Sequence, residues 1–208
     1  MDFQRPMGVV TPTLDGDVLA VLARAEDEFS GRRLHRLLGH GSEHGVRRAA
    51  DRLVDQGVVL RHQAGQAKMY RLNREHLAAP YIEGLSSLRA QLIGRLREAV
   101  RDWDPAPHSV FLFGSVARGE AGPQSDLDLL VIRRDETSEE ESAWRDQLAA
   151  CVSNATGWTG NEARILEYGV RELSDASVRP LIEEVLIDGI ALGGSRHDLR
   201  VLIEQGDA

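Results

Sequence analysis

The chain has 208 residues, 42% of them hydrophobic, and a formal net charge of −8. This length suits one large domain or two small ones, with enough apolar residues for buried cores. The sequence lacks both a long apolar run and the basic start of a signal peptide, so we expect a cytoplasmic protein without membrane contacts. Its single cysteine, Cys151, excludes an internal disulfide framework and a cysteine-based zinc site.

The charge is distributed unevenly along the chain. Residues 30–76 contain ten basic and four acidic side chains, so this segment carries +6 and the rest of the chain carries −14. A basic segment in an otherwise acidic chain indicates that this segment binds a polyanion such as nucleic acid. The alternative is a solvated basic helix face.

Helices and a hairpin are predicted in the first third of the chain. The predicted elements are a helix over 15–27, a short helix after Ser30, a helix over 42–57, and strands over 58–63 and 68–73. Gly39 and Gly41 should end the short helix, and Ser42 should cap the next one. Gly57 is a suitable stop for that helix.

This order of elements resembles a winged helix-turn-helix domain of bacterial transcription regulators. The resemblance covers about residues 14 to 75 and rests on Ser42, Val46, Ala49 or Ala50, Leu53 and Gly57. It implies that the helix over 42–57 enters the major groove of duplex DNA and that the hairpin forms a wing. The implied DNA-binding residues are His44, Arg47 and Arg48 on the helix and Arg61 and Lys68 on the wing. A winged fold used only for protein contacts is the alternative.

A longer amphipathic helix is predicted after Pro80, over 81–103. We expect it to join two domains, which gives boundaries of 1–76 for the winged domain, 77–104 for the connecting helix and 105–208 for the second domain. The alternative role for its apolar stripe is a homodimer contact.

The strongest motif lies between two apolar strands. The run 109–113 is predicted as a buried strand, and 127–134 as a second one. The motif reads Gly114, Ser115, Arg118, Gly119, Ser125, Asp126, Asp128 and Leu129. Carboxylates at alternate positions of a strand point the same way and repel each other. A positive group is therefore expected between Asp126 and Asp128.

This motif resembles the nucleotidyltransferase superfamily typified by DNA polymerase beta, and looks most like its small bacterial members, the minimal nucleotidyltransferases. The resemblance spans about residues 105 to 195. It implies an α/β domain with a mixed sheet, so that the whole chain is α+β. It also implies that Asp126 and Asp128 hold Mg²⁺ as catalytic residues, since magnesium prefers oxygen ligands. The implied binding residues for an NTP, with ATP the first choice, are Gly114, Ser115, Arg118, Gly119 and Ser125.

Active members of this family usually carry a third carboxylate on a neighbouring strand. Residues 162–168 are the natural candidate, and we predict Glu167 as the third catalytic acid. If the opposite face of that strand points to the site, the candidates become Glu162, Arg164, Leu166 and Tyr168. Arg164 would then put a cation where a second metal should lie. A solvent-facing Glu167, and an aspartate pair that merely caps a turn, are the alternatives to a catalytic site.

These features favour a metal-dependent nucleotidyltransferase fused to a DNA-binding domain. It would transfer a nucleoside monophosphate from an NTP to a hydroxyl on a protein, an RNA or a small molecule. A second hypothesis is a transcription regulator whose C-terminal domain binds a nucleotide without turnover. A third is the antitoxin-like partner of a toxin–antitoxin pair.

Overall fold

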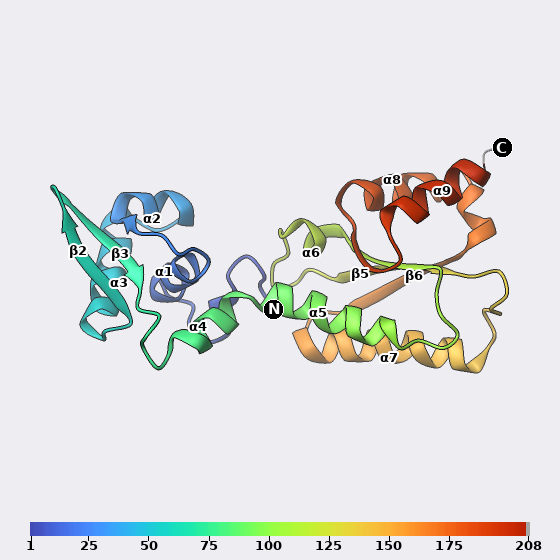
Figure 1. The fold of residues 1–208 in the computed structure, drawn as a ribbon, viewed down its shortest axis with the longest axis horizontal. Helices are drawn as coiled ribbons and strands as arrows, with labels where there is room; N and C mark the ends of the chain where they lie inside the picture. Colours follow the sequence, from blue (N-terminus) through green and yellow to red (C-terminus); the bar gives the residue numbers. More distant parts are fainter. Residues whose placement is uncertain (207–208) are drawn as a thin grey trace. The chain divides into compact units, whose positions relative to one another are not determined.

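The computed structural model describes residues 1–206, with side chains up to Glu204. The chain divides into two compact units (Figure 1). The N-terminal unit contains Asp2 and Gln4–Leu88, and the C-terminal unit contains Met1, Phe3 and the chain from Arg89 onward. No helix within the described residues is long and apolar enough to cross a membrane.

The N-terminal unit combines short helices with a three-stranded antiparallel sheet. Its elements are η1 (Pro6–Val9), α1 (Leu14–Ala23), β1 (Phe29–Ser30), α2 (Gly31–Leu38), α3 (Glu43–Asp55), β2 (Val59–Ala64), β3 (Ala67–Leu72) and α4 (Ala79–Ser86). The strand order is β1-β3-β2. The three predicted helices and the hairpin are confirmed, whereas β1 is too short to leave a recognisable pattern.

Local capping sets the helix boundaries of this unit. The Ser30 hydroxyl accepts a hydrogen bond from the Arg33 amide at 3.2 Å, and the Ser42 hydroxyl accepts one from the Gly45 amide at 3.0 Å. Gly39 ends α2 at a φ of 70°, in the left-handed region that glycine tolerates. The turn between α2 and α3 is therefore determined by residues within the turn itself.

The predicted connecting helix over 81–103 is wrong, because the structure has two helices there. The first is α4, and the second is α5 (Leu88–Arg101), which belongs to the C-terminal unit. The Ser86 hydroxyl donates to the Ile82 carbonyl at 2.8 Å, and the Ser87 hydroxyl donates to the Gly84 carbonyl at 3.0 Å. Such side-chain bonds compete with regular helical pairing, which explains the break at Ser87.

The C-terminal unit is built on a mixed sheet, as predicted, and this sheet has four strands. After α5 its elements are β4 (Ser109–Phe113), α6 (Gly114–Arg118), β5 (Leu127–Arg133), α7 (Ser142–Thr159), β6 (Ala163–Gly169), η2 (Val170–Ser174), α8 (Arg179–Asp188), β7 (Ile190–Gly193) and α9 (Arg196–Gly206). The strand order is β6-β5-β4-β7, with β5 and β6 parallel and the other two pairs antiparallel. Helices α5 and α7 cover one face, and α8 and α9 cover the other (Figure 1).

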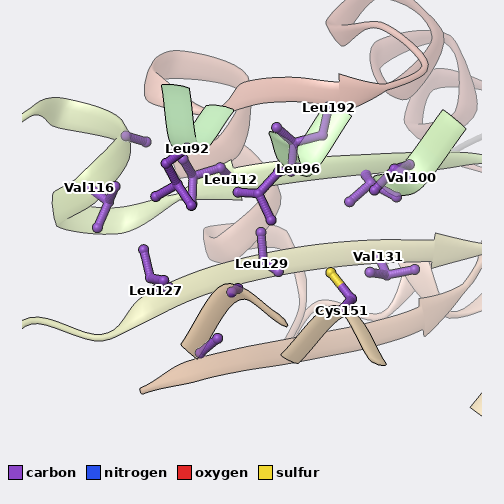
Figure 2. Close-up of a cluster of buried hydrophobic side chains, with 14 of the residues drawn as sticks. Leu92, Leu96, Val100, Leu112, Val116, Leu127, Leu129, Val131, Cys151 and Leu192 are labelled. Atoms are coloured by element: carbon purple, nitrogen blue, oxygen red, sulfur yellow. The ribbon is translucent and has the colours of Figure 1, made fainter. Parts of the chain in front are cut away.

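Strand β5 supplies core residues to both faces of this sheet. Leu127 and Leu129 pack toward α5 and α7 (Figure 2), whereas Leu130 and Ile132 pack toward α8. Side chains of a strand alternate between faces, so Asp128 shares the face of Leu130 and Ile132. It lies near the beginning of the strand, where that apolar face gives way to polar residues.

The Ser42 cap gives a first test of how the N-terminal unit is specified. Ser42→Ala should lower the free energy of unfolding by about 1 kcal/mol, because the Gly45 amide loses its partner at the start of α3. Urea unfolding followed by circular dichroism measures this. Ser42→Asp, which also caps well, should remain close to wild type. Equal stabilities for the alanine and aspartate variants would contradict this account.

Candidate functional site

The predicted motif is brought together where β4 ends and β5 begins. Phe113, the last residue of β4, pairs with Asp128 of β5. Gly114 follows with a φ of +69° and opens α6. A Cβ at Gly114 would lie 2.7 Å from the Asp128 Oδ2, which is too close for any other residue to fit without displacing the carboxylate. Glycine is thus required here both for its backbone conformation and for the space that Asp128 occupies.

Asp126 and Asp128 are electrostatically crowded. Burial, and then the negative charge of Asp126, raise the pKa of Asp128, although Arg164 acts in the opposite direction. Two carboxylates whose negative charges repel each other form a suitable site for a cation, which the sequence predicts at this position. Their oxygen atoms are the donors that Mg²⁺ prefers, with water and phosphate oxygens completing its shell.

Arg164 is the positive group that the structure places beside these carboxylates. It lies opposite Asp128 in the parallel pairing of β5 and β6. One Nη of its guanidinium lies 2.8 Å from the Asp126 Oδ2, and the other lies 3.2 Å from the Glu162 Oε2. The Arg164 side chain is 56% exposed, so it can move or meet a ligand. The alternative considered for β6, in which the face of Arg164 points to the site, is therefore the one observed.

The prediction of Glu167 as a third acid beside Asp126 and Asp128 is wrong. Glu167 pairs with Val131 and lies on the sheet face covered by α5 and α7. Side chains alternate along a strand, so a residue three positions after Arg164 must point to the opposite face. The Glu167 Oε1 accepts hydrogen bonds from Arg133 Nε and Trp144 Nε1, both at 2.8 Å. Glu167 therefore fastens α7 to the sheet.

Two other acids lie near the aspartate pair: Glu162, directly before β6, and Glu184 of α8, which pairs with Arg118 and whose charge also raises the pKa of Asp128. Glu162 is 67% exposed and pairs with Arg164. Across the described residues, no three histidine, cysteine or acidic side chains gather closely enough to hold a metal ion. The donor set thus fits one cation on Asp126 and Asp128, with the permanent positive charge of Arg164 next to it.

The remaining motif residues shape the loop between α6 and β5. Arg118 pairs with Glu120 at 3.0 Å and with Glu184 of α8 at 2.8 Å. Gly119 ends α6 at a φ of +77°. The Ser125 hydroxyl accepts from the Gly122 amide at 3.0 Å. Ser115 contributes its carbonyl to the same loop, where it accepts from the Glu120 amide. Phosphate contacts of these residues stay a prediction.

Sequence reasoning missed two residues that support the motif from outside it. Asn161 is 3% exposed, and its amide donates to the carbonyl of Ser125 at 2.7 Å, next to Asp126. Arg89 Nε donates to the carbonyl of Val116 in α6 at 2.8 Å. Asn161 follows Gly160 and reads as an ordinary turn residue, and Arg89 reads as a solvated helix residue, so neither leaves a signal in the sequence.

The predicted DNA-binding residues all lie on α3 and the β2–β3 hairpin. His44 and Arg48 are exposed on α3, and Arg47 there pairs with Glu43 one turn earlier. On the hairpin, Arg61 and Lys68 pair with Asp51 of α3 at 2.8 and 3.4 Å. The basic charge expected for this segment is therefore partly neutralised within the unit.

Asp51 holds the hairpin to α3. It also accepts a hydrogen bond from the Tyr70 hydroxyl at 3.0 Å. Burial alone would raise the pKa of Asp51, but the bonds from Arg61, Tyr70 and Lys68 together lower it. Burial and the bond to Asp51 raise the pKa of Tyr70 to about 12. A cavity of about 450 Å³ lies beside this cluster, lined by Arg32, Arg47, Asp51, Lys68 and Tyr70 among others.

Comparison with known proteins identifies the C-terminal part of the chain. Residues 93–186 match the family model described as a nucleotidyltransferase domain. The match extends from the middle of α5 into α8 and includes Gly114, Asp126 and Asp128.

Solved structures with a similar arrangement come from toxin–antitoxin complexes. One, a toxin–antitoxin crystal structure with AMP-PNP, is 20% identical over 55% of this chain and 83% of its own, with a TM-score of 0.40. Another, the toxin–antitoxin MntA-HepT, is 18% identical over 57% of this chain and 83% of its own, with a TM-score of 0.37. No curated protein matches the sequence.

The structural role of Glu167 in the nucleotidyltransferase domain can be measured. Glu167→Gln should lower the free energy of unfolding by about 1–3 kcal/mol, because Arg133, only 14% exposed, loses its charged partner. Nucleotide affinity should not change. Glu139→Gln is the matched control, because Glu139 meets the same arginine but is 70% exposed. A nucleotide-binding defect in Glu167→Gln without loss of stability would restore Glu167 to the site.

The Asp51 cluster predicts a pH dependence in the N-terminal unit. Because its pKa is lowered in the folded chain, Asp51 stabilises the fold above the usual aspartate pKa of about 3.9 and loses this effect as the pH falls through the lowered value. The stability difference between wild type and Asp51→Asn should therefore be full at neutral pH and shrink in acid. A difference that does not change from neutral to strongly acidic pH would refute the assignment.

Proposed function

We propose that the nucleotidyltransferase domain binds an NTP together with one Mg²⁺ held by Asp126 and Asp128, and transfers the nucleoside monophosphate to a hydroxyl acceptor. The observation that carries this proposal is the crowded aspartate pair, with Asp128 pressed against Gly114 at the end of β4. The family match over residues 93–186 supports it. ATP is the first nucleotide to test.

In this proposal the two aspartates bind and orient the metal–triphosphate. Bound there, a divalent cation neutralises phosphate charge and makes the α-phosphorus easier to attack. The acceptor oxygen forms a bond to the α-phosphorus, pyrophosphate leaves, and the hydroxyl proton passes to solvent. The motif residues Gly114, Ser115, Arg118, Gly119 and Ser125 surround the phosphates in this proposal.

Arg164 takes the place of a second cation in the proposed reaction. Its guanidinium lies next to Asp126 and carries a permanent positive charge. Such a charge stabilises the negative charge that develops on the reacting oxygens. It cannot accept the proton of the acceptor, which is why the proton is assigned to solvent.

A nucleotide-binding regulator without turnover is the second candidate function. The ion pair between Arg164 and Asp126 favours it, because this pair occupies a carboxylate that catalysis would need. In this alternative the bound nucleotide changes the affinity of the chain for DNA, and the nucleotide then dissociates without having reacted. The two candidate functions differ in whether a nucleoside monophosphate is transferred to an acceptor.

We also propose that the N-terminal unit is a winged helix-turn-helix that binds duplex DNA and regulates transcription. The order of α2, α3 and the β2–β3 hairpin supports this assignment. His44, Arg47 and Arg48 at the start of α3 would reach base edges, and Arg61 and Lys68 would meet phosphates. The proposed acceptor of the nucleoside monophosphate is a hydroxyl of a protein or an RNA. We further propose that the chain forms a homodimer.

Nucleotide titration and label transfer test the first domain. ATP should bind in the presence of Mg²⁺, and both EDTA and Asp128→Asn should abolish binding by calorimetry. Arg164→Ala should keep ATP binding, whereas transfer of labelled AMP to lysate components should fall by about 10²–10³-fold. Arg171→Ala, an exposed arginine paired with Asp135, is the control and should behave as wild type.

The outcomes separate the two candidates. Wild type that binds ATP but labels nothing would support the regulator and refute transfer. Equal ATP affinity with and without metal would refute the role of the aspartate pair altogether. Full labelling by Arg164→Ala would show that its charge is not used.

DNA binding is tested through the charges of α3 and the hairpin. Arg48→Ala should weaken duplex binding by about 1–3 kcal/mol if it reads a base, or reduce the salt slope by about one if it meets a phosphate. Asp51→Asn should strengthen binding and steepen its salt dependence, because it frees Arg61 and Lys68. Fluorescence anisotropy over a salt series measures both. Salt-insensitive binding, or none, would exclude this interface.

A further inference from the structure

The chain leaves the C-terminal unit after Phe3 and returns to it after Leu88. At both places, the residues on the C-terminal side are hydrogen-bonded to residues 116–125 or to the side chain that holds them. We call residues 116–125 the motif loop, because they join Gly114 and Ser115 to Asp126. Both connections between the two units are therefore hydrogen-bonded to the motif loop or to the side chain that holds it, next to the proposed nucleotide site.

Arg89 makes the first of these connections. It lies in the first turn of α5, directly after the helix break at Ser87. Its Nε donates to the Val116 carbonyl at 2.8 Å, and its Nη2 donates to the Ala117 carbonyl. These are carbonyls at the end of α6, where a basic side chain is favourable. Since α6 begins at Gly114, Arg89 holds the helix that opens the motif.

The N-terminal residues make the second connection. Phe3 is 5% exposed in the core of the C-terminal unit, and its amide donates to the Ala121 carbonyl at 3.2 Å. The carbonyl of Met1 accepts from the amide of Asn161 at 3.3 Å. The same Asn161 amide holds the Ser125 carbonyl, one residue before Asp126. The end of the motif loop is thus fixed to the segment that leads into the N-terminal unit.

We propose that Arg89 is a positioning residue for the nucleotide site and that the motif loop couples occupancy of this site to the DNA affinity of the N-terminal unit. The inference rests on the proposed function of both units. In this proposal, an NTP bound at Gly114 and Asp126 changes the conformation of the motif loop. The motif loop is in turn hydrogen-bonded to both segments that lead into the N-terminal unit. Coupling between two binding sites is reciprocal, so DNA must change the affinity for the nucleotide by the same factor.

The test measures DNA affinity of the full chain with and without ATP and Mg²⁺. For wild type, the dissociation constant of a labelled duplex should change by at least about fivefold on adding nucleotide. Arg89→Ala should still bind DNA, and it should bind ATP more weakly because α6 loses its support. At saturating ATP and Mg²⁺, the ratio of its DNA dissociation constants with and without nucleotide should fall below about twofold. Thermal unfolding of each variant separates a loss of stability from a loss of coupling.

Arg97→Ala is the matched control. Arg97 lies on the same helix and makes a similar bond, from Nε to the Ala191 carbonyl of β7 at 3.1 Å, away from the motif loop. Its variant should keep the wild-type ratio. Wild type that binds both ligands with no change in ratio, or Arg89→Ala with the full ratio, would overturn the coupling alone. Failure of wild type to bind DNA or ATP would overturn the proposed function and the coupling with it.

Discussion

The approach of Asp128 to Gly114, next to Asp126, is the constraint on which the rest of the site depends. The pairing of Phe113 with Asp128 forces the carboxylate against the turn, and a left-handed glycine is the residue that admits it. Two like charges at the start of β5 then require a compensating cation. The chain supplies one itself through Arg164, and the remaining carboxylate oxygens fit a metal.

The alternation of side chains along β5 and β6 explains which acid serves the site and which serves the fold. Arg164 and Asp128 share one face, whereas Glu167 shares the other with Val131. On that second face Glu167 is 20% exposed and is bonded to Arg133 and Trp144. A carboxylate with two hydrogen-bond partners stabilises the packing of α7 against the sheet.

Local signals in the sequence were sufficient for α1, α2 and α3, for the β2–β3 hairpin and for the motif, because caps, glycines and strand periodicity act over a few residues. Ser42 and Gly114 are clear cases. The face of β6 could not be predicted, because its register against β5 is set by packing across the sheet. The break at Ser87 depends on two hydroxyl bonds that compete with an otherwise regular helical pattern. Arg89 and Asn161 act through contacts distant in sequence, which no pattern records.

The central claim is that this domain holds one metal ion on Asp126 and Asp128, with Arg164 in place of a second. Counting bound Mn²⁺ by electron paramagnetic resonance, with a non-hydrolysable ATP analogue at saturation, tests it most directly. We expect one Mn²⁺ per chain for wild type and none for Asp128→Asn. Two bound ions in wild type, or one that survives loss of Asp128, would contradict it.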